Sequence, residues 1–389
     1  MSTSTASNKT TLPYLQIARG FAALFIVFNH TSQSAIYYWK FHALSDFFET
    51  GWCGVDFFFV LSGFIIYYIH ARDLGQKAKW KDYMYKRVTR IYPVYWVAAL
   101  LALILLKAAA GSGQLHRSEY VDAFQSPSYF LKSFFLFPQK RFPFLTVSWS
   151  LCYEMYFYLV FGLGILIDKR LLWLLPLVYL VINTWLIFDA RIFDNFVVYF
   201  LGNNNQLEFM FGMATAWFYL SAQDREKKGM NPHPILRWLW IPGVLVFLST
   251  WYACSTLPAT FGKMSYPTKF SFGIAAAVII FSIAHWKQLA GTVVNRFFLL
   301  LGDASYSLYL INILVVAVLF KFFTRIRLYP KGQLMDWAAF LCVVGICVMA
   351  GIALHLAVEK PLMDLFRGKT RSRQAKSSPV PAEPLIRDR

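Results

Sequence analysis

Arg19 and His30 are ionisable side chains that stand eleven residues apart in the first apolar run of the chain. On an α-helix this separation is close to three turns, so the two residues share one face, roughly 16 Å apart along the axis. A charged group inside a bilayer is costly unless paired or hydrated, so such a residue is a candidate for function. An imidazole, with an ordinary pKa of about 6.5, suits general-base catalysis at neutral pH. The alternative is a packing histidine that bonds to a neighbouring helix.

Two acidic residues, Asp56 and Glu154, are expected at a depth similar to that of His30, in two other apolar runs. A carboxylate beside an imidazole orients the ring and makes it more basic. We therefore expect Asp56 or Glu154 to hold His30 or to bind a substrate hydroxyl. The alternative is that each carboxylate only bonds one helix to another.

A basic stretch, KDYMYKRVTRIYP, precedes the third apolar run and contains Arg87 and Arg90. At a spacing of three these arginines share a helix face, and their guanidinium groups can bind phosphate oxygens in a forked geometry. The alternative is ordinary anchoring at the cytoplasmic surface. Glu359, near the end of the last apolar run, is expected either to form a salt bridge with one of these arginines or to be a charge at a helix end.

The elements that must position these residues are membrane helices. Of 389 residues, 58% are hydrophobic and only 15% are charged, whereas soluble chains carry about 25% charged residues. The apolar runs are long enough to cross a hydrocarbon core about 30 Å thick. We predict an all-α, multi-pass membrane protein of about ten spans: 14–36, 51–70, 91–110, 147–167, 171–188, 206–222, 237–255, 270–286, 298–322 and 337–358.

The basic residues indicate the topology, since basic loops stay on the cytoplasmic side. With both termini in the cytoplasm, most of the 38 lysines and arginines lie inside. The basic loop after the ninth span is an exception, since it would lie outside. The net charge of +18 then reflects topology and anionic lipids, with no nucleic-acid partner. We expect a disordered N-terminus (1–11), a membrane domain (12–363) and a basic disordered tail (364–389). The segment 111–146 is expected outside, and its aromatic second half is expected either to rest on the membrane surface or to cap the bundle.

The five cysteines show no metal-ligand spacing, so free thiols and no metal are expected. Six motifs in order resemble those of the acyltransferase 3 family, integral membrane O-acyltransferases of sugar polymers and some small molecules. The motifs are RGFAALFIVFNH, GVDFFFVLSGFII, KRVTRIYPVYW, VSWSLCYEMYFY, LGDASYSLYLIN and VEKP, and they run from Tyr14 to Pro361.

The resemblance implies roles for several residues. Arg19 and His30 correspond to the family's arginine and histidine separated by ten residues, and Arg87 and Arg90 to its Arg-x-x-Arg pattern. Glu154 matches the glutamate after the Trp-Ser pair, and Glu359 matches the glutamate before the proline. Asn312 stands where the family often has a histidine, so it is expected to have no catalytic role. The family's frequent esterase-like C-terminal domain is absent, which implies that transfer is completed in the membrane domain.

These observations predict an enzyme of a bacterial inner membrane. It moves an acyl group, for which acetyl is the first candidate, from cytoplasmic acyl-coenzyme A to a hydroxyl of an extracytoplasmic carbohydrate. His30, Asp56 and Glu154 are the expected catalytic residues; Arg19, Arg87, Arg90 and Glu359 are expected to bind the donor. His30 could act as a base or become acylated. The alternatives are a transporter or flippase of a lipid-linked sugar or an anion, whose usual internal repeat is not found, and a membrane scaffold.

Overall fold

The structure is a computed structural model of the 389-residue chain. It describes residues 12–366 except 42–44, 112–125, 189–193, 230–233, 258–259, 261, 263–264, 287–291, 328–329 and 331. The expected N-terminal segment 1–11 and most of the expected tail 364–389 therefore lie outside the described residues. The described part is helical and contains no strand.

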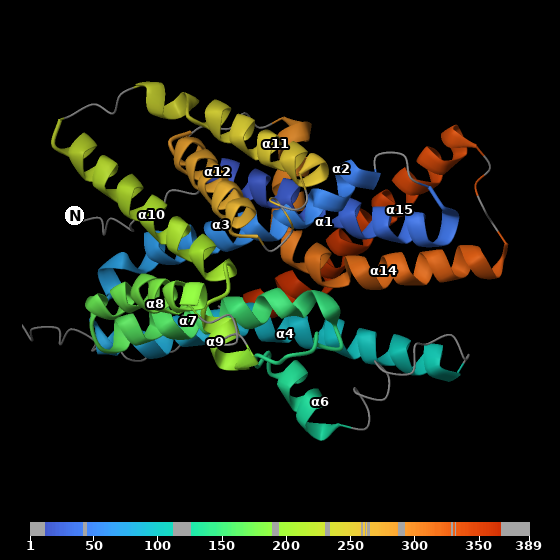
Figure 1. The fold of residues 1–389 in the computed structure, drawn as a ribbon, viewed down its shortest axis with the longest axis horizontal. Helices are drawn as coiled ribbons and strands as arrows, with labels where there is room; N and C mark the ends of the chain where they lie inside the picture. The colour runs from blue at the N-terminus through green and yellow to red at the C-terminus, as the bar shows by residue number, and fades with distance from the viewer. Residues whose placement is uncertain are drawn as a thin grey trace, which may run out of the picture.

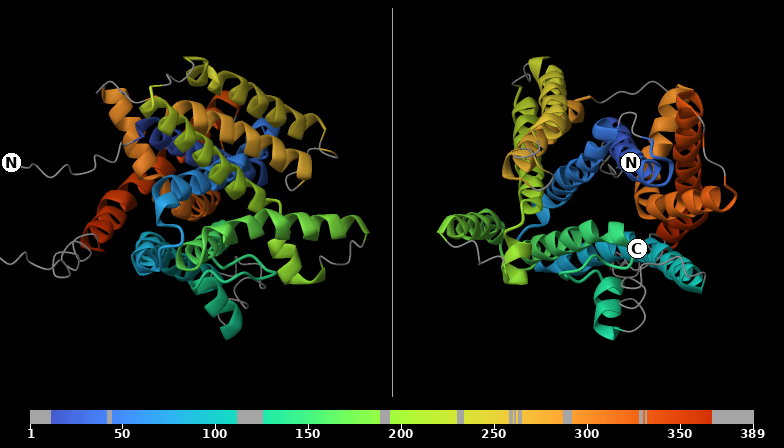
Figure 2. Two further views of the ribbon diagram at one scale, coloured as in Figure 1. Left: turned by 90° about the vertical axis from the view of Figure 1, so that its left-hand side faces the viewer. Right: turned by 45° about the vertical axis from the view of Figure 1, so that its right-hand side comes forward.

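Two helices, α1 (Pro13–Trp39) and α3 (Cys53–His70), lie at the centre of the molecule and run antiparallel. Three groups of longer helices surround them (Figures 1 and 2). These groups are α4 (Lys77–Gly111), α7 (Trp149–Leu166) and α8 (Leu174–Phe188); α10 (Asn205–Lys227), α11 (Trp240–Thr256) and α12 (Tyr266–Ala284); and α13 (Val293–Asp303), α14 (Ser305–Arg325) and α15 (Gln333–Leu354). The shorter helices are α2 (Ser45–Glu49), α6 (Pro127–Phe134) and α9 (Phe196–Leu201).

Glycines allow α3 to lie close to both of its main neighbours. A Cβ atom on Gly54 would stand 2.3 Å from the carbonyl oxygen of Ala22 in α1. A Cβ atom on Gly212 of α10 would stand 2.0 Å from the carbonyl oxygen of Val60 in α3. Small residues permit this close backbone approach, which is a common way for membrane helices to pack. The backbone of α3 is thereby held in a fixed position between α1 and α10.

Each of the ten expected spans falls on a helix, but only seven helices in the described part are long and apolar enough to cross a membrane. α8 has 15 residues, and α1 and α10 carry more polar side chains. The count of ten therefore stays a prediction. The expected ninth span, 298–322, is wrong as one helix, because the chain turns at Ala304 and separates α13 from α14.

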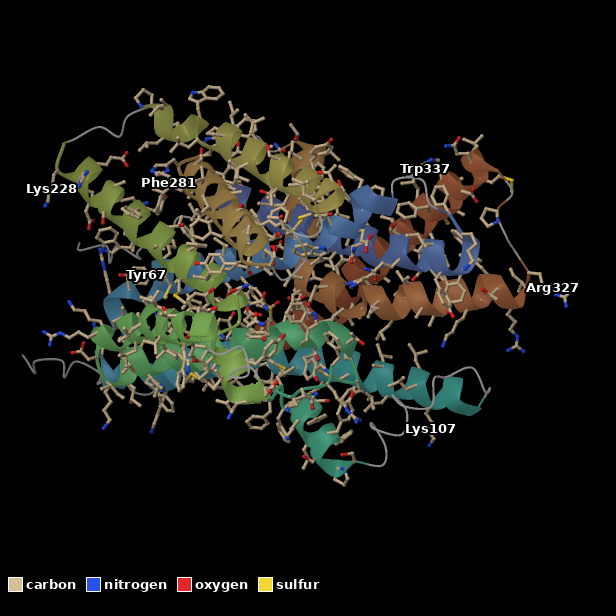
Figure 3. All side chains as sticks on the ribbon, in the orientation of Figure 1. Tyr67, Lys107, Lys228, Phe281, Arg327 and Trp337 are labelled. Atoms are coloured by element: carbon tan, nitrogen blue, oxygen red, sulfur yellow. The ribbon has the colours of Figure 1, made fainter. Side chains whose placement is uncertain are left out.

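Three basic residues mark the two ends of the bundle. Lys107, near the end of α4, and Arg327, just after α14, lie at one end of the molecule, and Lys228, just after α10, lies at the other (Figure 3). Alternating spans require this grouping, since the loops after α4 and α14 are expected on one side and the loop after α10 on the other. Which end faces the cytoplasm stays a prediction.

We expect Gly212→Val to destabilise the folded protein, because its side chain would overlap the carbonyl of Val60 and overpacking costs about 1–3 kcal/mol. The matched control is Gly345→Val in α15, where a Cβ atom meets nothing within 4 Å. The measurement is the melting temperature in detergent together with the monodisperse fraction on size exclusion. Equal melting temperatures for the two variants would show that the close α3–α10 contact is not needed.

Candidate active site

A narrow cavity of about 80 Å³ lies among α1, α3, α4, α7 and α14. Four of the seven expected site residues line it: Arg19, Arg87, Arg90 and Glu154. They come from three helices and are up to 135 positions apart in the chain. Three tyrosines, Tyr158, Tyr306 and Tyr309, also line it, so the cavity has a cationic, hydrogen-bonding lining within an otherwise largely apolar wall.

Arg87 is held in one orientation by three neighbours. Its side chain is 7% exposed, and the guanidinium carbon lies 5.7 Å from the ring centroids of both Tyr83 and Tyr158. Its Nη2 donates to Nε2 of His70 over 3.4 Å, and Nδ1 of His70 donates to Oδ2 of Asp73 over 2.7 Å. Sequence reasoning missed His70 and Asp73. Their spacing of three at the end of α3, directly before the basic stretch, was the available signal.

The side chains that line this cavity carry an excess of positive charge. Nε of Arg87 is buried and has no hydrogen-bond partner among the described residues. Arg19 donates to Gln16 over 3.1 Å, and Gln16 in turn donates to Asp303. Glu154 is the one carboxylate among the lining residues, against three guanidinium groups. Because a buried charge is costly unless it is paired, this arrangement favours an anionic ligand such as a phosphate.

Glu154 lies in the cavity beside two hydroxyl groups. The Tyr158 hydroxyl donates to its Oε1, and the Ser62 hydroxyl donates to the same oxygen over 3.2 Å. Ser62 belongs to α3 and Tyr158 to α7, so Glu154 joins two helices through hydrogen bonds. It also sets a negative charge next to the arginines, where it can orient them.

His30 lies on α1 against α14, and its hydrogen bond fixes which nitrogen carries the proton. Nδ1 of His30 is 2.5 Å from Oδ1 of Asn312. Nδ2 of Asn312 donates to the carbonyls of Leu308 (3.1 Å) and Tyr309 (2.7 Å), so its oxygen must face the imidazole. The amide oxygen can only accept, which assigns a hydrogen to Nδ1 and leaves Nε2 of the neutral ring as the proton acceptor.

The group that orients His30 at Nδ1 is therefore an amide, where sequence reasoning expected Asp56 or Glu154. Asn312 was expected to have no catalytic role; the structure gives its amide a positioning contact with His30. Depth in the membrane had suggested the carboxylates, but depth does not determine which way a helix faces.

Asp56 belongs to a different buried cluster. It forms an ion pair with Lys269 of α12, and Lys269 Nζ is 3.5 Å from Oε1 of Glu208 on α10. All three side chains are at most 2% exposed. Sequence reasoning missed Lys269, which stands one turn inside the start of an apolar helix. A lysine inside an apolar run was the signal that could have found it.

Glu359 ends a π-helical turn, His355–Glu359, that follows α15. Its Oε2 accepts from Ser307 over 2.7 Å and lies 2.9 Å from Nδ1 of His355. The structure thus pairs Glu359 with α14 and with its own turn, and not with Arg87 or Arg90. A π-turn carries one extra residue per turn, which shifts the side chains after it around the helix axis and often marks a functional site.

The chemistry available to this arrangement is acyl transfer. A neutral imidazole with Nε2 ready to accept a proton can activate a hydroxyl, and guanidinium groups can hold an anionic donor. No group of three or more His, Cys, Asp or Glu side chains that could hold a metal ion occurs in the described part of the chain.

Comparison with known families decides the class of protein. The acyltransferase domain family matches residues 12–356, nearly all of the described chain. The chain belongs to the acyltransferase 3 family. This acyltransferase is therefore an enzyme and, with its apolar helices, a multi-pass membrane protein.

Two curated relatives cover most of this acyltransferase. It is 29% identical over 336 residues to the exopolysaccharide production protein ExoZ of Rhizobium meliloti, covering 83% of this chain and 92% of that one. It is 24% identical over 397 residues to the acyltransferase MdmB of Streptomyces mycarofaciens, covering 95% of this chain and 96% of that one. No solved structure matches the chain.

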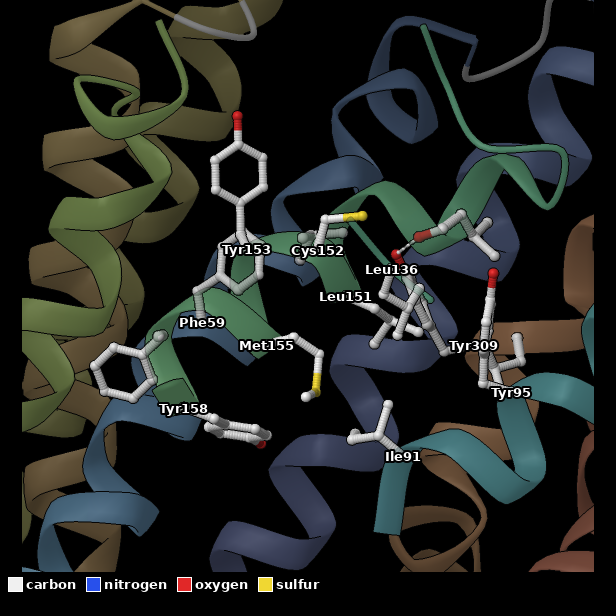
Figure 4. Close-up of a cluster of buried hydrophobic side chains, with 14 of the residues drawn as sticks. Phe59, Ile91, Tyr95, Leu136, Leu151, Cys152, Tyr153, Met155, Tyr158 and Tyr309 are labelled. Atoms are coloured by element: carbon white, nitrogen blue, oxygen red, sulfur yellow. Dashed lines mark hydrogen bonds between the residues drawn. The ribbon is translucent and has the colours of Figure 1, made fainter. Parts of the chain in front are cut away.

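One family motif, LGDASYSLYLIN, connects the separate parts of the acyltransferase site. A Cβ atom on Gly302 would stand 1.9 Å from the carbonyl oxygen of Gln16, so only glycine lets α13 approach α1 beside Arg19. Farther along the motif, Ser307 bonds Glu359 and Asn312 bonds His30. Tyr309 lines the cavity, and its hydroxyl donates to the carbonyl of Val147 over 2.6 Å. Figure 4 shows Tyr309 near the α7 side chains Leu151 and Cys152.

We expect Asn312→Ala to lower the acyl-transfer rate roughly 100-fold, because the imidazole loses the acceptor that fixes its tautomer. Asn312→Asp keeps an oxygen facing Nδ1 and should recover a large part of that loss. The measurement is the turnover rate of both purified variants across a range of pH, with size exclusion as the folding control. Wild-type turnover in Asn312→Ala would rule out this orienting role.

Proposed function

We propose that this membrane acyltransferase moves an acyl group from acyl-coenzyme A on the cytoplasmic side to a hydroxyl of an extracytoplasmic sugar. Acetyl is the first candidate for the acyl group. The observation that carries the proposal is the cavity with three arginines, one of which has a buried Nε with no partner among the described residues. Coenzyme A carries phosphates that such a cavity can bind. The protein then acts in a bacterial inner membrane on an exopolysaccharide or O-antigen type of acceptor, in line with the name of its relative, the exopolysaccharide production protein ExoZ.

The reaction needs little from the protein besides proton transfer and positioning, since a thioester is already activated. Nε2 of His30 takes the proton from the acceptor hydroxyl, and the oxygen attacks the thioester carbonyl. The carbon–sulfur bond then breaks, and coenzyme A leaves as the thiolate. His30 still holds the proton at this point. Arg87 and Arg90 hold donor phosphates, while Arg19 lines the path of the pantetheine arm. Glu154 keeps Tyr158 and Ser62 in place beside them.

Asn312 supports the role of His30 as a base. A histidine whose Nδ1 donates to an amide oxygen carries its basic lone pair on Nε2, and this nitrogen can remove a proton or become acylated. The two routes differ in one measurable way, because only an acyl-histidine route leaves acetyl on the protein when the acceptor is withheld. Mass spectrometry of the protein after incubation with acetyl-coenzyme A alone separates them.

We expect His30→Ala to lower acetyl transfer at least roughly 100-fold while expression and elution on size exclusion stay unchanged. The matched control is His285→Ala, because His285 lies at the end of α12 and lines neither the cavity nor the α1–α14 contact. The assay follows labelled acetyl from acetyl-coenzyme A to carbohydrate. Full activity in His30→Ala would refute the mechanism, and sugar transport in vesicles without any acetyl transfer would favour a transporter.

We expect Arg87→Gln to weaken acetyl-coenzyme A binding roughly 10- to 100-fold, because a charge-assisted hydrogen bond contributes about 1.5–3 kcal/mol. S-acetylpantetheine carries no phosphate, so its use by the same variant should hardly change. Lys86→Gln is the control, since Lys86 is exposed and pairs with Asp82 at 2.6 Å. Equal losses with both donors would show that Arg87 does not bind phosphate.

A further inference from the structure

A second cavity of about 300 Å³ adjoins the first one but is built from other residues. It lies between the first turn of α3, the start of α7, helix α9, the starts of α10 and α12, and the segment 138–143. Val55 lines both cavities. Phe59 lines the first cavity and packs against Trp149 and Tyr153, which line the second, with ring centroids 6.3 and 6.4 Å apart. Figure 4 shows Phe59 and Tyr153. A thin apolar wall therefore separates the two spaces.

Asn205, at the start of α10, carries the argument for a ligand. Its side chain is fully buried and lines this second cavity, and neither Oδ1 nor Nδ2 has a hydrogen-bond partner among the described residues. Its backbone N–H donates to Oδ1 of Asn203 over 3.0 Å, so the residue is held in place. A buried amide without partners is costly, which indicates that a bound group supplies both a donor and an acceptor.

The other polar groups of the cavity suit the same ligand. Asp56 and Lys269 line it and pair with each other, and Glu208 lies behind Lys269 at 3.5 Å. The pair presents an acceptor and a donor. Lys140 and Arg141 also line the cavity, so its lining carries three cations and one carboxylate. The Asn205 amide nevertheless selects a ligand with hydroxyl groups, because it needs both a donor and an acceptor, and an ionised phosphate offers only acceptors.

Aromatic rings form much of the remaining wall. Tyr153 stacks on Phe200 with centroids 4.4 Å apart, and Trp52 and Trp149 also line the cavity. Flat rings offer apolar contact surface, while polar groups at a few points fix orientation. A pyranose ring matches this pattern, because its faces carry C–H groups and its edge carries adjacent hydroxyls, each of which both donates and accepts.

We propose that the second cavity binds one monosaccharide unit of the acceptor, with the Asn205 amide bridging two adjacent hydroxyls. This inference rests on the proposed function, and it names the acceptor subsite. A lipid chain fits the cavity poorly, since it would leave the Asn205 amide and the Asp56–Lys269 pair against hydrocarbon.

The test uses methyl glycosides of glucose, galactose, mannose and N-acetylglucosamine as probes on the purified full chain. Binding without donor is read from tryptophan fluorescence, because Trp52 and Trp149 line the cavity. Acetylation with acetyl-coenzyme A is read by mass spectrometry. We expect at least one glycoside to bind, and Asn205→Ala to raise its half-saturating concentration at least tenfold while the acetyl-coenzyme A concentration dependence stays unchanged.

The matched control is Gln206→Ala, because the neighbouring Gln206 is also a buried amide with an unpartnered Nε2 among the described residues but does not line the cavity. Size exclusion checks the folding of both variants. Unchanged glycoside binding in Asn205→Ala, an equal loss in Gln206→Ala, or no binding of any of the four probes overturns the subsite. Glycoside binding that depends on Asn205 but gives no acetylation would keep the subsite and refute the proposed function.

Discussion

The placing of buried charge is the constraint on which this structure depends. Charged side chains inside apolar helices must be paired or must meet a ligand, since neither lipid nor a dry interior solvates them. The described helices meet this requirement in two ways. Asp56, Lys269 and Glu208 pair with one another at the junction of α3, α10 and α12. Arg19, Arg87 and Arg90 gather around one cavity in which a single lining carboxylate opposes them.

The two clusters differ in whether the protein itself supplies the partners of its buried charges. Asp56 and Glu208 supply the partners of the Lys269 ammonium from within the protein. Nε of Arg87, by contrast, has no partner in the described part. Asp73 and His70 hold Arg87 through a chain of hydrogen bonds, yet they leave its Nε available. A side chain that is positioned but not satisfied is ready to bind an anion, because the cost of orienting it has been met before the ligand arrives.

Sequence reasoning predicted which residues share a cavity better than it predicted their hydrogen-bond partners. The motif spacing identified Arg19, Arg87, Arg90 and Glu154, and the fold brings these four to one cavity. The pairing of His30 with a carboxylate was expected from depth alone, and the structure places Asn312 at its Nδ1. Depth follows from counting residues along a helix, but facing depends on helix rotation and crossing. Those are set by contacts such as Gly54 against Ala22 and Gly302 against Gln16.

The same limit applies to the helices. Apolar composition located every long helix, but it could not show that α13 and α14 are separate, because apolar stretches lie on both sides of the short polar segment around Ala304. That break matters for the site. α13 ends where Gly302 touches α1 beside Arg19, and α14 then carries Tyr309 to the cavity and Asn312 to His30. A single continuous helix would keep one direction along its axis. The turn at Ala304 therefore lets one motif serve both the arginine end of the site and the histidine end.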